Sequence, residues 1–190
     1  MNFSVLRSRA DMGTIKLKEH YKTLKTSWIR ISSMQVISSE DSIYLLEFAE
    51  KRGLEGEIAR LKLREKATIV AGITCAMKAI EAELKAYFEG TLKNFETPLY
   101  ISGSPFQKKV WEELIGIPYG QTRTYAAQAE AIGKKSSYRA VANANRANQI
   151  AIVIPCHRII NSNGKLGGYS GGESRKQWLL EHERRYISSK

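Results

Sequence analysis

The sequence predicts an α+β protein, because strand-like and helix-like segments are separated along the chain. Runs rich in β-branched and aromatic residues, which suit pleated strands, occupy 28–31, 34–37 and 43–48. After residue 104 the apolar residues recur instead at helical spacing, in short segments. We therefore expect a small sheet in the first half and a mostly helical second half.

A single helix is predicted after these strands, from 74 to 89, because apolar residues recur at helical spacing and Gly90 ends the pattern. Cys75 lies on this apolar helix, and we expect it to be buried in the core. The segment 57–65 fits a strand or a helix. Residues 1–27 are polar and basic and predict no element.

The helical half begins at Ser104, whose hydroxyl suits a helix cap before the proline that follows it. Helices are then predicted at 124–132 and 137–147 with a glycine-containing turn between them, which is the layout of a helix–turn–helix. The second of these helices combines small alanines with the polar Arg139 and Arg146. Such a helix can approach another surface closely, and that surface could be DNA or another helix.

A β-branched run at 150–154 predicts a buried strand, and a last helix is expected from 173 to about 183. The connector between the halves is broken by proline, glycine and serine. We therefore expect an N-terminal α/β domain at 1–98, a linker at 99–103 and a C-terminal domain at 104–190.

Charge is unevenly distributed over the 190 residues, whose formal net charge is +11. The part from Ser104 onwards has 14 Lys and Arg against 6 Asp and Glu, whereas the preceding part has 16 against 13. A basic surface favours polyanions such as nucleic acid, although many basic domains bind none. Charge alone therefore leaves a DNA-binding function open.

Residues 1–9 have no sustained apolar core and no small-residue cleavage site, so we do not expect secretion, and no apolar stretch in the sequence approaches transmembrane length. Two cysteines far apart are too few for a disulfide framework or a CxxC metal site. We expect an intracellular, cytoplasmic protein with no membrane partner.

The candidate chemistry centres on the pentapeptide Ile154-Pro155-Cys156-His157-Arg158. A thiol becomes a good nucleophile as the thiolate, and adjacent positive charge lowers the pKa of a cysteine. A cysteine beside an imidazole is therefore a candidate for covalent chemistry. An arbitrary cysteine is more often a small core residue, so the pentapeptide alone leaves both interpretations open.

A series of short motifs runs in order through the second half. They are Ser104-Pro105-Phe106-Gln107, Val110-Trp111, Ile117-Pro118-Tyr119-Gly120, Thr124-Tyr125, Tyr138-Arg139-Ala140-Val141-Ala142, Asn148, the Cys156 pentapeptide, Gly168-Tyr169-Ser170-Gly171-Gly172 and Trp178-Leu179-Leu180-Glu181-His182-Glu183. Together they resemble the O6-alkylguanine-DNA alkyltransferases, or methylated-DNA–protein-cysteine methyltransferases. The resemblance implies a small antiparallel sheet plus a helix, ribonuclease H-like, followed by a winged-helix-like domain that contains the helix–turn–helix.

The resemblance also implies the catalytic roles. Cys156 would take the alkyl group from O6 of guanine, and His157 would accept the thiol proton through a water. Glu183 would orient His157 and balance its charge, which follows the general logic of an activated nucleophile. Asn148 would act as a hinge residue that bonds the backbone near the cysteine turn.

The DNA contacts are likewise implied by the resemblance. Arg139 would enter the base stack in place of a flipped nucleotide, and the small Ala140 would allow its helix into the minor groove, with Arg146 on the same helix. The substrate pocket would be formed by Tyr125, which presses on the target phosphate and contacts the base, together with Ile159, Tyr169 and Ser170. Backbone carbonyls of Cys156 and Ile159 would accept hydrogen bonds from the guanine edge, and Ser170 would donate toward O6.

The implied function is DNA repair by irreversible, stoichiometric alkyl transfer, by a monomer acting on double-stranded DNA that contains O6-alkylguanine. Activity on O4-alkylthymine is left open. No cofactor is expected, and no zinc, because only Cys75 and His20 precede the second half as ligands of the usual kind. Two other classes remain: a related module that recognises lesions without repairing them, and a cysteine hydrolase that uses Cys156 and His157, which would need an oxyanion hole.

Overall fold

The computed structural model describes residues 21–29 and 33–187, and it confirms the predicted α+β class. One sheet has the strand order β3-β2-β1-β4. Its strands are β1 (Lys22–Ile29), β2 (Met34–Ser38), β3 (Ile43–Phe48) and β4 (Ala67–Ala71). β2 is antiparallel to both of its neighbours, but β4 runs parallel to β1, so the sheet is mixed rather than antiparallel as the resemblance implied.

The parallel strand pair results from a helical crossover. After β3 the chain forms α1 (Leu54–Glu65) and then returns as β4, which is the connection that parallel strands require. The segment that fitted a strand or a helix is therefore α1. β4 and the first residues of β1 were not predicted, while residues 1–20 and 30–31, the latter in the first predicted strand, lie outside the described part.

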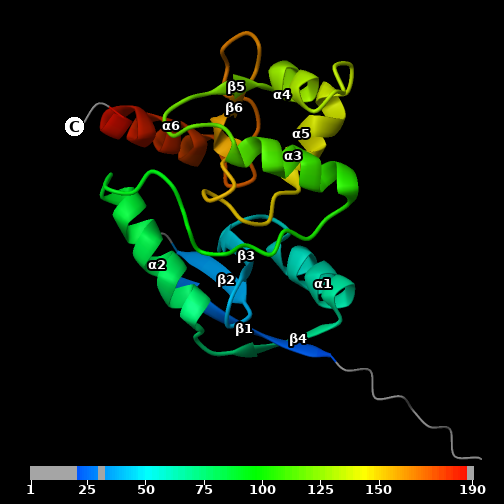
Figure 1. Cartoon of the computed structure of the whole chain (residues 1–190), viewed down its shortest axis with the longest axis vertical. Coiled ribbons are helices and arrows are strands. Elements are labelled where there is room, and N and C mark those ends of the chain that lie inside the picture. Colours follow the sequence, from blue (N-terminus) through cyan, green and yellow to red (C-terminus); the bar gives the residue numbers. More distant parts are fainter. Residues whose placement is uncertain (1–20, 30–32, 188–190) are drawn as a thin grey trace, which may run out of the picture.

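Two helices cover the sheet where one was predicted (Figure 1). α1 buries Leu54 and Leu61 in one apolar cluster, and α2 (Cys75–Phe88) buries Met77 and Ile80 in another. Cys75 itself is exposed, contrary to the prediction. Thr74 caps the helix and Cys75 takes its first position, outside the apolar face that packs on the sheet.

The second half contains the four predicted helices, which are α3 (Pro105–Ile115), α4 (Tyr125–Ala131), α5 (Tyr138–Arg146) and α6 (Glu173–Ile187). Ser104 and Gln107 bond reciprocally in a capping box at the start of α3. α4 and α5 pack on each other across a turn, which confirms the helix–turn–helix layout. The two-residue strands β5 (Arg123–Thr124) and β6 (Ile159–Ile160) pair in parallel nearby.

The run at 150–154 is buried, as predicted, but it is a turn and not a strand. Within it, Ile150 makes an isolated β-bridge to Leu46 of β3. Ile152 has a φ of 71°, which is strained for a β-branched residue. The turn leads into a short 3₁₀ helix, Cys156–Arg158.

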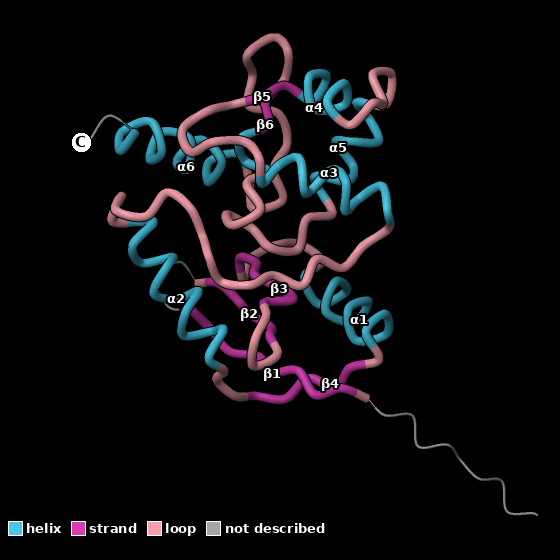
Figure 2. Tube along the Cα trace, in the orientation of Figure 1, coloured by secondary structure: helices cyan, strands magenta, loops and turns pink. Residues whose placement is uncertain are grey.

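A single hydrophobic cluster joins the two halves, since it includes Met34 of β2, Trp111 of α3 and Val141 of α5. The loop from 89 to 104 runs between the sheet and the helices (Figure 2), and Tyr100 N donates to Ile43 O of β3. The division into two domains stays a prediction. No described helix has the length and apolar character needed to cross a membrane.

Candidate active site

Cys156 lines an open cavity of about 240 Å³. The cavity is built by α4, α5 and the loop before α6, and its other lining residues are Tyr125, Ala142, Asn143, Asn145, Arg146, Gly168, Tyr169 and Ser170. Cys156 is 7% exposed, so this cavity is the approach to its sulfur. The structure thus brings Tyr125, Arg146, Tyr169 and Ser170, all predicted for the site, together around the thiol.

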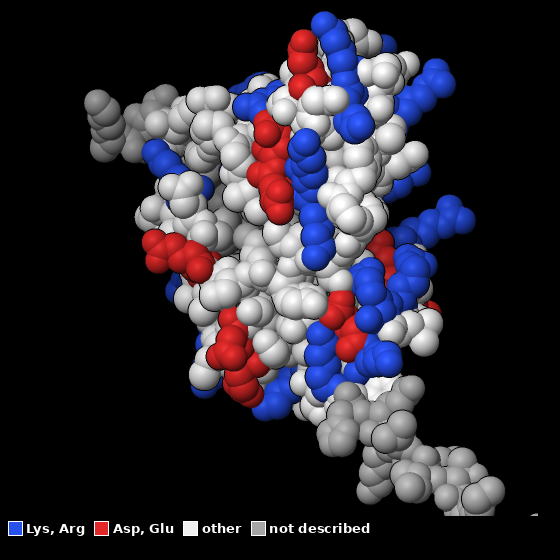
Figure 3. Space-filling model, turned by 45° about the vertical axis from the view of Figure 1, so that its right-hand side comes forward, with Lys and Arg blue, Asp and Glu red and all other residues white. Residues whose placement is uncertain are grey.

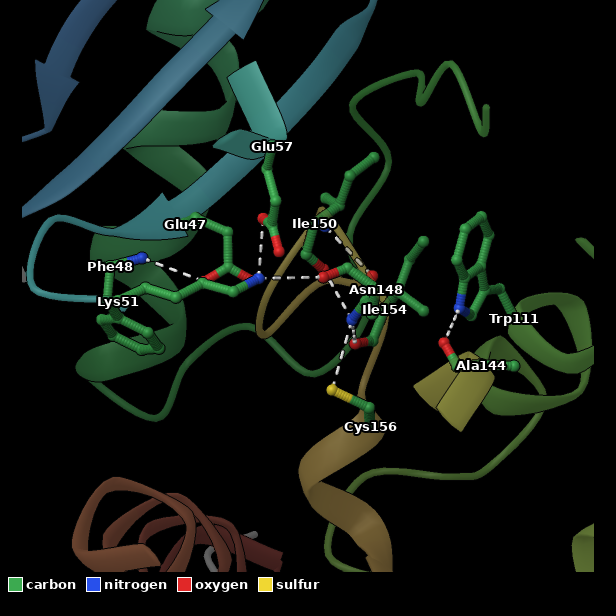
Figure 4. Close-up of polar contacts among 10 residues, drawn as sticks. All are labelled: Glu47, Phe48, Lys51, Glu57, Trp111, Ala144, Asn148, Ile150, Ile154 and Cys156. Carbon is green, nitrogen blue, oxygen red and sulfur yellow. Dashed lines mark hydrogen bonds and ion pairs between the residues drawn. The ribbon is translucent and has the colours of Figure 1, made fainter. Parts of the chain in front are cut away.

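Asn148 lies just after α5 and holds the turn that carries Cys156 (Figure 4). Its amide nitrogen donates to Ile154 O at 2.8 Å and lies 3.3 Å from Cys156 Sγ. Its amide oxygen accepts from Ile150 N at 3.0 Å. These contacts are the ones that a hinge between α5 and the cysteine turn would need.

The thiol is held in its protonated form. Burial raises the pKa of Cys156 to about 11, and the hydrogen bond from Asn148 offsets only part of that effect. The sequence interpretation expected the neighbouring His157 and Arg158 to lower this pKa, but both side chains bond to Glu183 instead. A base must therefore take the proton before the sulfur can attack.

His157 is fully buried, and its Nε2 lies 2.8 Å from Glu183 Oε1. Burial lowers the pKa of His157, so the ring is neutral near pH 7. A carboxylate can only accept, so the neutral ring carries its proton on Nε2 and leaves Nδ1 as the basic nitrogen. Nδ1 is buried and has no hydrogen-bond partner within residues 21–29 and 33–187.

Glu183 of α6 collects donors from several elements. Tyr87 Oη of α2 donates to it at 2.9 Å, Gly120 N at 2.9 Å, and the Arg158 guanidinium through Nε and Nη2. Burial works to raise the pKa of Glu183, but the hydrogen bonds and charges of His157 and Arg158 outweigh it and lower that pKa to about 2. Glu183 is therefore a fixed anion behind His157.

The exposed surface of α5 continues outward from the cavity. A second cavity of about 490 Å³ shares Tyr125, Ala142 and Gly168 with the first and reaches Arg139. Arg139 and Ala140 are exposed on α5 and do not line the Cys156 cavity. Basic side chains stand out along the right-hand edge of the molecule in Figure 3.

Ile159 is the one predicted pocket residue that does not line the cavity, since its side chain is fully buried. Its carbonyl accepts a hydrogen bond from Lys176 Nζ, which also donates to Leu166 O. Burial lowers the pKa of Lys176 to about 8. A carbonyl oxygen has two lone pairs, so Ile159 O can accept a second hydrogen bond besides that from Lys176. Its contact with the edge of a guanine base stays a prediction.

Sequence reasoning missed the burial of Lys176, because nothing local marks a lysine on a helix as buried. It placed Tyr87 among the apolar residues of the predicted helix at 74–89, but it missed the hydrogen bond from Tyr87 to Glu183. It also missed the contacts of Arg158, although that residue stood in the motif. In the described part of the chain, no cluster of three His, Cys, Asp or Glu residues could hold a metal ion. His20 lies outside that part.

Comparisons with known proteins agree on one family. A family model described as "6-O-methylguanine DNA methyltransferase, DNA binding domain" matches residues 105–185. A methylated-DNA–protein-cysteine methyltransferase of Methanosarcina barkeri is 54% identical over 101 residues, covering 53% of this chain and 64% of the relative. One of Mycolicibacterium paratuberculosis is 54% identical over 104 residues, covering 55% and 63%. The alignment thus covers less than two thirds of the length of each of these two relatives.

Solved structures extend the likeness to the first half. The crystal structure of Mycobacterium tuberculosis OGT in complex with DNA is 35% identical with a TM-score of 0.72, covering 86% of this chain and 94% of that one. A structure of the O6-methylguanine methyltransferase of the same organism is 34% identical with a TM-score of 0.73, covering 88% and 96%.

Proposed function

Since the chain belongs to the O6-methylguanine-DNA methyltransferase family, we propose that it repairs DNA by taking an alkyl group from O6 of guanine onto Cys156. The substrate is double-stranded DNA that contains O6-alkylguanine. Because O6 lies inside the base stack, the damaged nucleotide rotates out of the duplex to reach the cavity. The thioether product is stable, so each molecule acts once. In this proposal the protein acts as a monomer and needs no cofactor.

The observation that carries this proposal is a cavity-lining thiol whose neighbour in the sequence is a buried base, His157. Cys156 opens onto a cavity, and the next residue offers a basic Nδ1 with no partner among the described residues. Glu183 is a permanent anion that stabilises the imidazolium once His157 takes the proton. A module that recognised lesions without repairing them would have no use for this arrangement.

The proposed reaction balances without another reagent. The thiol proton passes to Nδ1 of His157, relayed by a water. The sulfur electron pair forms the bond to the alkyl carbon as the bond from that carbon to O6 breaks. The electrons of the broken bond stay on the guanine, which takes back through water the proton that the thiol gave up, and unmodified guanine is restored in the DNA strand.

The cavity walls supply the contacts to the base. Ser170 Oγ and Tyr169 Oη are buried and lack hydrogen-bond partners in the part of the chain that the structure describes. In the proposal Ser170 donates toward O6, which makes guanine a better leaving group, and Tyr169 walls the pocket. Tyr125, at the junction of the two cavities, contacts the base and its phosphate.

In the proposal, Arg139 fills the space that the flipped nucleotide leaves, and the alanines of α5 allow the helix to enter the minor groove. Arg139 lines the outer cavity and is exposed, which suits a side chain that enters the stack. Arg146 lies at the rim of the inner cavity. Activity on O4-alkylthymine is compatible with the same chemistry.

The test uses a DNA duplex with one O6-methylguanine, followed by intact-protein and peptide masses. We expect one methyl group on the peptide that contains Cys156, saturating at one per molecule. Cys156→Ala should bind the duplex but gain no methyl group, while Cys75→Ala should react as the wild-type chain does. Binding of the lesion by an unmodified wild-type protein would instead indicate recognition without repair, and repeated turnover on an ester would indicate a hydrolase.

A second measurement separates flipping from chemistry. Arg139→Ala should slow the reaction with duplex DNA by at least about tenfold, since unstacking a base costs a few kcal/mol and about 1.4 kcal/mol of that cost already corresponds to tenfold in rate. Its reaction with free O6-benzylguanine should be unchanged, because no flipping is required. Arg184→Ala, on the exposed side of α6, is the charge-matched control. Equal losses in both reactions would show that Arg139 has a structural role.

A further inference from the structure

The sheet half touches the cysteine turn directly. Leu46 N of β3 donates to Gln149 O at 2.8 Å, and Ala151 N donates to Leu46 O at 2.7 Å. Both bonds fall in the segment between Asn148 and Cys156. The edge of the sheet therefore continues into the turn that carries the thiol.

Beside these bonds, Lys51 lies in the turn between β3 and α1 with its side chain 5% exposed. Its ammonium contacts Glu47 Oε1 at 3.0 Å, Glu57 Oε2 at 2.8 Å and Asn148 O at 3.5 Å (Figure 4). Glu47 is fully buried and also accepts from Phe48 N at 3.2 Å. The buried Lys51 ammonium, held by two carboxylates, thus contacts the backbone carbonyl of Asn148, and the side chain of Asn148 donates to Cys156 Sγ.

We propose that Lys51 is a positioning residue that, held by Glu47 and Glu57, fixes Asn148 against the thiol and sets how readily Cys156 loses its proton. The use of this arrangement in alkyl transfer rests on the proposed function. The effect of Lys51 on the reactivity of the thiol does not depend on that function, and any reagent that alkylates Cys156 can measure it.

The charges of the cluster act on the thiol with opposite signs. The Glu47 carboxylate raises the pKa of Cys156, and the Lys51 ammonium lowers it. Other groups face the sulfur as well: Asn148 donates to it, Lys176 also lowers its pKa, and Tyr125 and Tyr169 lie in the cavity wall. Removing Lys51 should therefore make the thiol harder to deprotonate, and neutralising Glu47 should make it easier.

The experiment follows alkylation of Cys156 by iodoacetamide between pH 7 and pH 10, with peptide masses separating Cys156 from the exposed Cys75. Lys51→Met should slow the reaction at pH 9 by about tenfold, which corresponds to one pKa unit, because both the cation and the anchor of Asn148 are lost. Glu47→Gln should speed it by about threefold. Lys51→Arg keeps the charge and should restore most of the rate.

Lys25→Met is the matched control, because it removes one positive charge from an exposed ion pair with Glu40 in the same half. Its rate should equal that of the wild-type chain. A merely structural role for the cluster predicts that Lys51→Met and Glu47→Gln both loosen the turn and both speed alkylation. That result, or rates equal to those of the control, overturns the proposal. If Lys51→Met does not fold, Lys51→Gln is the second variant, since it also removes the positive charge that lowers the pKa of Cys156. It should slow alkylation at pH 9, and faster alkylation than in the wild-type chain overturns the proposal.

A second arm uses O6-benzylguanine on the same variants. If the wild-type chain takes no benzyl group on Cys156, the proposed function fails, while the order of the iodoacetamide rates still tests the role of Lys51. If benzyl transfer occurs, its rates should follow the same order. Benzyl transfer with no difference among the variants would support the proposed function and contradict the role of Lys51.

Discussion

Glu47 in the sheet half and Glu183 in the helical half are both fully buried, yet their pKa values move in opposite directions. That of Glu183 is lowered to about 2 and that of Glu47 is raised to about 7. Burial works to raise both. Glu183 receives a tyrosine hydroxyl, a backbone N–H, an imidazole and a guanidinium, whereas Glu47 shares one ammonium with a second carboxylate, Glu57.

The difference indicates that the number and charge of the donors decide whether a carboxyl group stays an anion against the effect of burial, which outweighs the donors of Glu47 but not those of Glu183. The two carboxylates contact different partners near the cysteine turn, Lys51 for Glu47 and His157 for Glu183, and suit different tasks. Glu183 is a constant negative charge for a protonated His157. Glu47 changes its charge near neutral pH, and the turn beside it carries the thiol.

The largest effect is expected from Glu183→Gln. The change keeps the shape but leaves the guanidinium of Arg158, which is 5% exposed, without its anion, so the free energy of unfolding at pH 7 should fall by about 3–5 kcal/mol. Because the folded pKa lies below the unfolded value near 4.5, this stabilisation is complete above pH 4.5 and is lost as the pH falls toward 2. Urea denaturation across that range measures it.

Glu181→Gln is the control for this prediction, because Glu181 is exposed on the same helix. It should change the free energy of unfolding by less than about 0.5 kcal/mol. A loss for Glu183→Gln that persists unchanged at pH 2 would contradict the assignment of the stabilisation to the ionised carboxylate.

The same chemical change at Glu47 should have the opposite sign. Its folded pKa, about 7, lies above the unfolded value near 4.5, so ionising it destabilises the fold as the pH rises through this window. The wild-type chain should lose about 3 kcal/mol between pH 4.5 and pH 8, at 1.36 kcal/mol per pKa unit. Glu47→Gln should not show this loss and should be the more stable protein at pH 8.

Denaturant titrations of both proteins at several pH values test this prediction, with Glu81→Gln on the exposed side of α2 as control. If Glu47→Gln is instead less stable than wild type at pH 8, then Lys51 outweighs burial. Glu47 would in that case be an anion of the same kind as Glu183.

These two carboxylates also show what could be predicted from the sequence. Cys156 and His157 are adjacent, so their pairing was visible in the chain, and Glu183 followed from a motif that the resemblance supplied. Lys51 and Asn148 are 97 residues apart, and Tyr87 and Glu183 are 96 apart. No local pattern marks such pairs, because only the fold brings them together.

The fold class and the helices of the second half could be predicted because caps, glycines and apolar spacing are local signals. The run at 150–154 was predicted as a strand and is a turn, since a buried β-branched run fits both and the hydrogen bonds of Asn148 decide between them. Cys75 was predicted in the core and is exposed, because its place at the first helical position depends on the cap at Thr74.

A smaller effect is expected from Tyr87→Phe, which removes one donor from Glu183. Tyr87 is fully buried and its hydroxyl donates at 2.9 Å, so the loss should lower the free energy of unfolding by about 1–2 kcal/mol. The pKa of Glu183 should rise, because one of the bonds that favour its ionised form is gone. Urea denaturation and the acid midpoint measure the two effects, with Tyr138→Phe on the exposed face of α5 as control. An unchanged acid midpoint would show that the charged partners alone hold Glu183 ionised.

The smallest effect is expected from Glu57→Gln, which leaves Glu47 as the sole carboxylate on Lys51. The negative charge of Glu57 contributes to the raised pKa of Glu47, so its removal should lower that pKa, by less than about one unit. The ¹³C shift of the Glu47 carboxyl group against pH reports it, and Glu55→Gln, exposed on the same helix, is the control. A lower pKa of Glu47 would show that a carboxylate with an ammonium to itself is more readily ionised, as the comparison with Glu183 predicts. No fall would mean that burial alone keeps Glu47 near neutrality, and the contrast between the two carboxylates would then reflect their depth rather than their donors.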